Sequence, residues 1–288
     1  MTPALERLAG LAQSGGQPFI ALQRLHVLEG VLRRVSRRPD RDTLVLRGSL
    51  MTRLWARPSH RVANDVDFVT TFDFDPHRAV ELLRAALTPP DCDDGVSFSP
   101  ELLRSETTWS ETPFPGVRVT VPSWVGEFHH EVQIDLGFAD PLVPAAVWLD
   151  YPSLSPEWNA RVLSCRPELG CAWKIHGLFE KGPWRKKDLH DVGLILRHTP
   201  LEVGMLQDAV RVAFESRQTP LHTIRRLLEG NFGASPSSQR TWRRFRREQA
   251  DPTIPENLSV VVQSVAEVDL HTMRSLHFRG VRLMDISR

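Results

Sequence analysis

Apolar positions follow two different periods along the chain, and the change of period predicts two structurally distinct parts. In the first part, short apolar or alternating stretches predict strands at residues 43–47, 66–71, 116–122 and 130–138. Apolar residues three or four positions apart predict helices in the same part at residues 2–13, 22–32, 50–56 and 75–87. Beyond Leu169 the spacing is helical throughout, with predicted helices at residues 172–180, 187–197, 201–215, 220–228, 241–249 and 255–264.

These elements predict an α+β fold in two domains. Residues 1–155 are expected to form a mixed β-sheet flanked by helices, and residues 156–288 a C-terminal helical bundle. A linker-like region punctuated by prolines begins after Pro141 and contains the expected boundary. The length of 288 residues and the hydrophobic content of 41% suit one large or two modest domains.

Overall charge says little about partners, but local charge is uneven. The formal net charge is +1, so no global field attracts the protein to nucleic acid. One basic cluster comprises Arg33, Arg34, Arg37, Arg38 and Arg41. A second comprises Arg240, Arg243, Arg244, Arg246 and Arg247, interleaved with Trp242 and Phe245. This second segment fits either a surface that tracks and stacks on nucleic acid or an amphipathic helix with both aromatic residues in the core.

The remaining composition predicts a cytoplasmic protein without a membrane span. The three cysteines fit neither a disulfide framework nor a zinc pattern, and are interpreted as thiols in a reducing compartment. The N-terminus carries an early glutamate and lacks the long apolar core of a signal peptide. No apolar run approaches the roughly 20 residues that cross a bilayer.

Two aspartates at the start of a predicted strand form the strongest chemical signal. Because strand side chains alternate, Asp65 and Asp67 point to the same face, where their mutual repulsion favours a divalent cation such as Mg²⁺. The same spacing occurs at Asp73 and Asp75, but Asp75 precedes Pro76 and is expected to cap a helix. Asp135 lies on the polar side of a later strand. If that strand is adjacent, three carboxylates converge; otherwise Asp135 is a solvent-facing edge residue.

Upstream of the aspartates, Gly48-Ser49 follows a predicted strand and precedes a helix. The N–H groups of such a turn can bind phosphate. The simpler interpretations are a glycine with positive φ at position 48 and an ordinary helix N-cap at Ser49. Arg61 fits either a phosphate contact or an exposed loop.

Three charged residues of the helical part are further candidates. Lys174 lies among apolar residues and either extends to solvent or directs its charge into a site. Asp188 and Asp191 lie one helical turn apart, although Asp188 also suits the first turn of a helix.

Taken in order, these motifs resemble the AbiEii/AbiGii-type nucleotidyltransferase toxins, including the MenT-like group, within the polymerase-β-like nucleotidyltransferases. Their Gly-Ser motif and Arg-x-Ser/Thr-x-Asp-x-Asp segment resemble Gly48-Ser49 and residues 61–67. A later strand motif resembles residues 132–141, an Ala-Glu-Lys motif resembles residues 172–174, and a basic helix start resembles residues 185–192. The resemblance runs from about Leu44 to about Phe245.

The resemblance implies a Mg²⁺-dependent toxin of a toxin–antitoxin pair. It would transfer a nucleotide from an NTP, with CTP as one candidate, to the 3′ end of tRNA and so block aminoacylation and translation. Asp65, Asp67 and Asp135 would hold the metal, and Asp135 would also help to deprotonate the attacking hydroxyl. Phosphate contacts would come from Gly48, Ser49 and Arg61.

The resemblance further implies that Lys174 neutralises triphosphate charge, and that Asp191, or otherwise Asp188, completes the site. A cognate antitoxin is the expected protein partner. Two other hypotheses stay open: transfer to a protein or small-molecule acceptor, and a non-catalytic interaction protein on the same scaffold. One departure is Ala63, which stands where the family has a hydroxyl residue.

Overall fold

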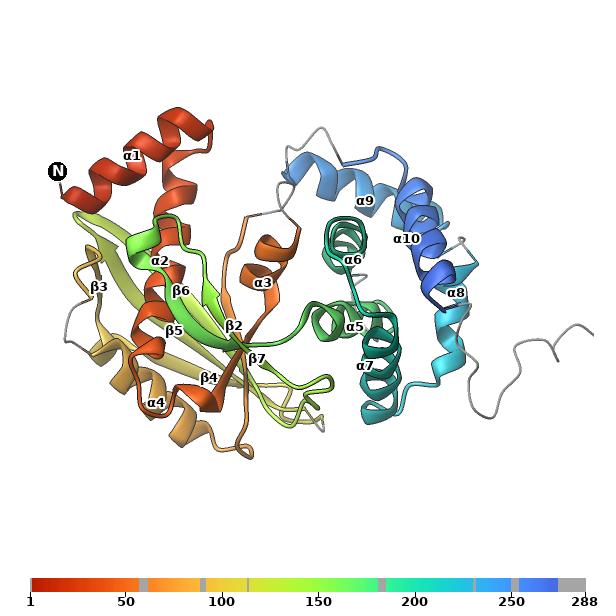
Figure 1. The fold of residues 1–288 in the computed structure, drawn as a ribbon, viewed down its shortest axis with the longest axis horizontal. Coiled ribbons are helices and arrows are strands. Elements are labelled where there is room, and N and C mark those ends of the chain that lie inside the picture. Colours follow the sequence, from red (N-terminus) through yellow and green to blue (C-terminus); the bar gives the residue numbers. More distant parts are fainter. Residues whose placement is uncertain are drawn as a thin grey trace, which may run out of the picture. The chain divides into compact units, whose positions relative to one another are not determined.

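The structure of the protein is a computed structural model that describes residues 2–56, 62–88, 92–112, 114–180, 185–229, 232–249 and 254–273. The chain divides into two compact units, Met1–Arg166 and Pro167–Arg288 (Figure 1). The first contains the sheet, and the second is helical. The predicted α+β fold class is therefore confirmed.

The first unit is built on one mixed sheet in the order β3-β5-β6-β2-β1-β8-β7, with β4 added on β5. Two pairs, β1 with β8 and β2 with β6, are parallel, and the other pairs are antiparallel. The strands are β1 (Leu44–Arg47), β2 (Val66–Thr70), β3 (Val96–Phe98), β4 (Arg104–Thr108), β5 (Gly116–Val125), β6 (Phe128–Gly137), β7 (Val147–Tyr151) and β8 (Ala160–Ser164).

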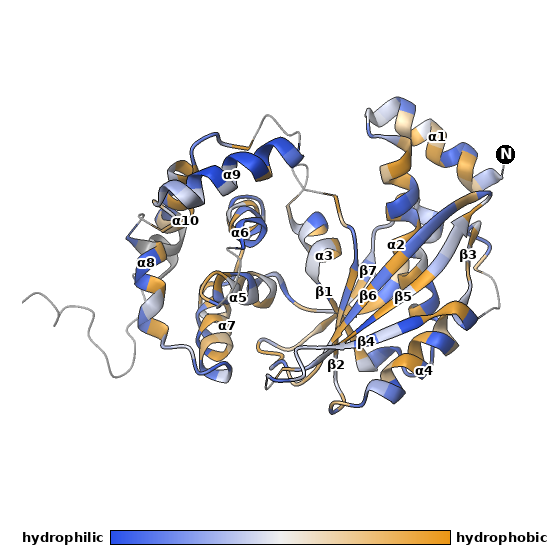
Figure 2. Ribbon diagram, turned by 180° about the vertical axis from the view of Figure 1, so that it is seen from behind, coloured by the Kyte–Doolittle hydropathy of each residue, from blue (hydrophilic) through white to orange (hydrophobic). Residues whose placement is uncertain are grey.

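One face of this sheet forms the core beneath the helices. The helices of the unit are α1 (Pro3–Gly15), α2 (Phe19–Ser36), α3 (Gly48–Trp55) and α4 (Pro76–Leu87). Strand residues such as Phe68, Ile134 and Val119 are fully buried in one cluster with Leu28 of α2 and Leu83 of α4. Figure 2 shows the alternation of hydrophobic and hydrophilic residues along β5 and β6 that leaves a second, polar face.

Helix starts follow the capping signals of the sequence. Thr2 accepts a hydrogen bond from the Leu5 N–H at 3.4 Å at the start of α1. Asp75 accepts one from the Arg78 N–H at 2.9 Å at the start of α4. Asp75 thus has the capping role that the Asp-Pro sequence predicts, and the Asp73/Asp75 pair serves structure.

The linker expected after Pro141 is replaced by two strands. β7 and β8 pair with each other, and β8 joins the sheet through a parallel pairing with β1. Tyr151 and Val162 are buried in the core of the first unit. Because β8 completes the sheet, the units divide after Arg166, later than the boundary expected after residue 155.

The second unit contains six α-helices among its described residues. They are α5 (Pro167–Gly177), α6 (Lys186–His198), α7 (Val203–Ser216), α8 (Arg225–Leu228), α9 (Pro236–Gln249) and α10 (Leu258–Met273). The segment predicted as one helix at 220–228 is a 3₁₀ turn, Leu221–Ile224, followed by α8. Across the part of the chain that the structure describes, no helix has the length and apolarity needed to cross a membrane.

The first basic cluster is largely enclosed by the protein. Arg33 and Arg34, at the end of α2, have side chains that are only 5% and 6% exposed, and both pair with the fully buried Asp94. Arg34 NH1 lies 3.0 Å from Asp94 Oδ2. Burial alone would raise the pKa of Asp94, but the two guanidinium groups outweigh it and lower the pKa to about 2.

Candidate functional site

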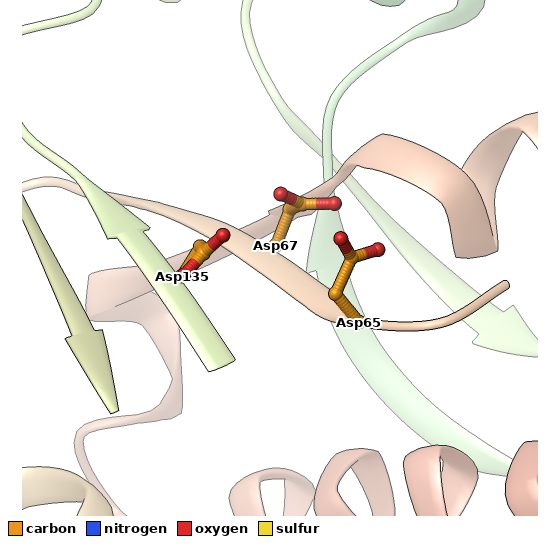
Figure 3. A group of neighbouring side chains, drawn as sticks. All are labelled: Asp65, Asp67 and Asp135. Carbon is orange, nitrogen blue, oxygen red and sulfur yellow. The ribbon is translucent and has the colours of Figure 1, made fainter. Parts of the chain in front are cut away.

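Three aspartates converge on the polar face of the sheet (Figure 3). Asp67 lies on β2 and Asp65 directly precedes that strand, while Asp135 lies on β6. The two strands are parallel neighbours, with Asp67 opposite Asp135. One carboxylate oxygen from each residue lies within 4.8 Å of the others, and all three residues are half-buried. The adjacency on which the three-carboxylate hypothesis depended is therefore present.

Strand periodicity explains why these side chains share a face. Val66 and Phe68 on β2, and Ile134 and Leu136 on β6, point into the core below the sheet. The residues between them must point to the other side. Each aspartate is thus fixed by apolar neighbours that are themselves fully or almost fully buried.

Gly48 gives the chain room to pass beside these carboxylates. Its φ of +74° is in the left-handed region. A Cβ built at this position would lie 1.8 Å from Asp67 Oδ2. Both the backbone conformation and the close approach exclude other residues here, so the sharp turn into α3 brings the first N–H groups of that helix beside Asp67.

Ser49 is bonded to the acidic cluster. Its hydroxyl donates to Asp65 Oδ1 at 3.0 Å, and the residue is 5% exposed. The N-cap position of α3 belongs to Arg47, so the alternative interpretation of Ser49 as an N-cap is wrong. Its hydroxyl instead orients the first carboxylate.

Charged residues of opposite sign form a row across four neighbouring strands. The register places Arg47 opposite Asp67, Asp67 opposite Asp135, and Asp135 opposite Arg118. Arg118 donates to both oxygens of Asp135, at 2.8 and 3.1 Å, and this hydrogen bonding raises the pKa of Arg118. At the other end, Arg47 NH1 lies 2.8 Å from Asp140 Oδ2. The sheet thus surrounds its carboxylates with fixed positive charge.

Arg118 is a site residue that the sequence interpretation missed. A signal for it existed, because Arg118 lies between Val117 and Val119 in the alternating stretch that predicts β5. Gln133 of β6, one of the polar positions of its strand, also donates to Asp135 at 3.0 Å. Asp135 is consequently held by three hydrogen bonds and is not a free edge residue.

The second unit carries a separate charged cluster of its own. Lys174 of α5 donates to Asp191 of α6 at 2.8 Å and to Asp188 at 3.4 Å. Asp191 is fully buried, and the lysine side chain is 12% exposed. The lysine is therefore held by carboxylates rather than extended to solvent. Asp188 also lies in the first turn of α6, as its simpler interpretation expects.

Comparison with protein families identifies the chain. Residues 30–264 match the family described as nucleotidyl transferase AbiEii toxin, type IV toxin–antitoxin system. The chain belongs to the AbiEii family. The resemblance seen in the motifs is thereby confirmed, and membership implies a nucleotide substrate and an antitoxin partner. Comparison with curated proteins gave no match.

Solved structures resemble this AbiEii protein at low identity. The crystal structure of JHP933 from Helicobacter pylori has a TM-score of 0.50 and 12% identity, and the alignment covers 89% of this chain and 93% of that one. A second H. pylori structure has a TM-score of 0.49 and 11% identity, covering 98% of this chain and all of the other. At this level of identity the likeness to JHP933 concerns the fold alone.

Two positions of the AbiEii motif need separate mention. Arg61 lies outside the described residues. Ala63, which stands in place of the family's hydroxyl residue, is 2% exposed and packs in the core of the first unit. A methyl group suits that apolar environment, and a hydroxyl there would need a hydrogen-bond partner.

Proposed function

We propose that this protein is a Mg²⁺-dependent toxin that transfers a nucleoside monophosphate from an NTP to the 3′ end of tRNA. The added nucleotide would block aminoacylation and thereby translation. The observation that carries the proposal is the convergence of Asp65, Asp67 and Asp135 beside the Gly48-Ser49 turn. It occurs in a chain that belongs to a family of nucleotidyltransferase toxins.

The residues present fit a hard divalent cation. Three carboxylates within 4.8 Å provide only oxygen donors, which Mg²⁺ prefers, and one or two such groups usually share the ion with substrate phosphates. When bound, the ion would neutralise the triphosphate and polarise the α-phosphate. Asp65 and Asp67 are proposed as its main ligands, because Asp135 is already held by Arg118 and Gln133.

The chain's own residues would bind and orient the two substrates. The first N–H groups of α3, at Gly48 and Ser49, suit a phosphate, and Arg61 would assist them. Asp135, fixed in direction by its hydrogen bonds, is proposed to accept the proton of the attacking 3′-hydroxyl. Attack in line at the α-phosphate would expel pyrophosphate.

The charged cluster of the second unit has a proposed role in the same reaction. Lys174 would neutralise negative charge on the triphosphate. Asp191 and Asp188 would hold its ammonium group in place, consistent with separations of 2.8 and 3.4 Å. We give Asp191 the larger share, because it is fully buried and makes the shorter contact.

The test is incorporation of label from each NTP, supplied separately, into purified tRNA. Wild-type protein should label the 3′ end of tRNA in the presence of Mg²⁺ and leave it unlabelled with excess chelator. Asp67→Asn should lower the rate at least about 100-fold, since it removes charge from the metal and triphosphate site. Asp73→Asn is the matched control, because Asp73 has the same spacing from a second aspartate but is exposed near a helix cap.

The other hypotheses predict different observations in the same assay. With cell lysate added, label on protein or on a small molecule and none on RNA would assign another acceptor. Growth inhibition by Asp67→Asn equal to that of wild type, when expressed at the same level, would argue for a non-catalytic toxin.

A further inference from the structure

Helix α9 carries a row of arginines on one exposed face. Arg240, Arg243, Arg244 and Arg247 are all exposed, and their spacing of three and four residues places them on the same side of the helix. Arg240 and Arg247 are separated by about 10 Å along the axis, at about 1.5 Å per residue. Figure 2 shows α9 as a strongly hydrophilic helix.

The opposite face fixes the helix in the second unit. Trp242 and Phe245 are fully buried and contact the ring of His190 on α6, with centroids 6.3 and 5.6 Å away. The Trp242 indole N–H donates to the Pro255 carbonyl at 2.9 Å. Of the two interpretations of this segment, the amphipathic helix with core aromatics is confirmed, and base stacking by these rings is excluded by their burial.

The charge on the exposed face is little compensated. Glu248 is the acidic residue of α9, and Arg244 binds it at 2.8 Å. Arg240, Arg243 and Arg247 have no ion pair with any residue that the structure describes. The hydrogen bond from Arg244, with the nearby Lys186 and Lys187 of α6, lowers the pKa of Glu248. The positive field therefore extends from α9 to the start of α6.

The chemistry of this face favours a polyanion over a protein partner. Protein interfaces usually centre on apolar or aromatic side chains. Here the exposed positions of α9 are charged or polar, and both aromatic residues point inward. A row about 10 Å long matches roughly three phosphates of one strand, at about 3.4 Å of axis per strand charge in a duplex.

We propose that the arginine face of α9, with Lys186 and Lys187, binds the phosphate backbone of RNA through charge alone. This inference rests on the proposed function only for the choice of tRNA as ligand. It assigns the backbone contact to a surface that reads no bases and does not stack on them. Binding should therefore be insensitive to tRNA sequence and steeply dependent on salt.

The test measures tRNA affinity over a range of salt concentrations, using full-length protein with Asp67→Asn so that binding is separated from chemistry. The variant carries Arg240→Gln, Arg243→Gln and Arg247→Gln. We expect its affinity to fall about tenfold or more near physiological salt, and the slope of log K against log[salt] to fall by about 2–3, at roughly 0.7–0.9 per phosphate contact.

Two further variants make the result specific. Arg7→Gln, Arg161→Gln and Arg211→Gln remove the same charge from exposed positions elsewhere and should leave the salt slope unchanged. Replacing the three α9 arginines by lysine should restore most of the slope, since only charge is required. Circular dichroism and thermal melting confirm folding of each variant.

Equal salt slopes in the two glutamine variants would overturn the inference. So would normal tRNA affinity combined with lost neutralisation by the antitoxin, which would assign the face to an acidic protein. The proposed function fails separately. If wild-type protein binds tRNA through α9 but adds no nucleotide, the transfer hypothesis is wrong while the α9 inference holds.

Discussion

Two arginine clusters that are alike in sequence have opposite environments in the structure. Arg33 and Arg34 at the end of α2 are almost fully buried and share one carboxylate, Asp94. The arginines of α9 lie on an exposed face whose acidic residue, Glu248, contacts one of them. Local composition therefore does not distinguish a structural ion network from a binding surface. The difference comes from what the tertiary fold places against each helix.

The buried cluster depends on a distant part of the chain. Asp94 is 60 residues away from Arg34, and the same segment accepts a hydrogen bond from the other side of α2, where the His26 ring lies 2.8 Å from the Asp94 carbonyl oxygen. Burying two guanidinium groups costs much free energy unless such partners are present. In α9 no such cost arises, because water solvates the exposed arginines.

The largest effect is expected from removing the shared carboxylate. Asp94→Ala leaves two buried positive charges uncompensated and should lower the free energy of unfolding by about 3–5 kcal/mol. Urea denaturation of purified protein measures this. Asp40→Ala is the matched control, since it breaks the partly exposed Arg38–Asp40 pair and should cost at most about 1 kcal/mol. Equal losses would remove the distinction between buried and exposed arginine.

Acid should weaken the buried network specifically. Burial, followed by the charge of Arg33, lowers the pKa of His26 to about 4 from its usual 6.5. The unfolded chain then binds a proton that the folded chain resists, so stability falls as pH decreases from about 6.5 to about 4. At about 1.4 kcal/mol per pH unit between the two pKa values, the loss approaches about 3 kcal/mol.

The variant His26→Gln should flatten this pH dependence, as measured by urea midpoints at several pH values. Asp94 acts in a lower range: because its folded pKa is about 2, its contribution is present above about 4 and disappears as pH falls toward 2. A dependence unchanged in His26→Gln between pH 6.5 and 4 would place its origin elsewhere.

Arg118 is an arginine of intermediate exposure, with 34% of its side chain accessible. Arg118→Gln should cost only about 1 kcal/mol of stability, because water compensates part of the lost pair. It should at the same time increase the affinity for Mn²⁺, used as a spectroscopic probe, since Asp135 loses its competing cation. Titration followed by electron paramagnetic resonance measures the affinity. Weaker Mn²⁺ binding would instead mean that Arg118 serves mainly to hold Asp135 in position.

The smallest change is expected at α9. Arg240→Gln, Arg243→Gln and Arg247→Gln together should alter the free energy of unfolding by about 0.5 kcal/mol or less, since exposed substitutions rarely do more. Arg34→Gln alone, a single change in the buried cluster, should exceed the effect of all three. The reverse order would contradict the comparison between the two clusters.

Periodicity in the sequence predicts most of the acidic site. Alternation along β2 and β6 is sufficient to place Asp65, Asp67 and Asp135 on the polar faces of their strands. That the two strands are neighbours is a property of topology, which alternation does not report. Arg118 was within reach of the same reasoning, because it occupies the polar register of β5.

Other features depend on contacts that no local pattern contains. β4, with the sequence Arg-Ser-Glu-Thr-Thr, has no apolar residue and is a strand only through its pairing with β5. β7 and β8 lie among prolines that suggest a linker. The burial of Arg33 and Arg34 likewise arises from a carboxylate in a loop far along the chain.

The absence of a side chain at Gly48 has a consequence for genetics. Every missense change at this codon adds a Cβ where Asp67 Oδ2 would lie 1.8 Å away, in a backbone conformation that other residues rarely adopt. Selection for cells that survive expression of the toxin should therefore recover many different substitutions at this one position. Survivors at Gly48 that still produce folded protein would supply inactive toxin for isolating the antitoxin.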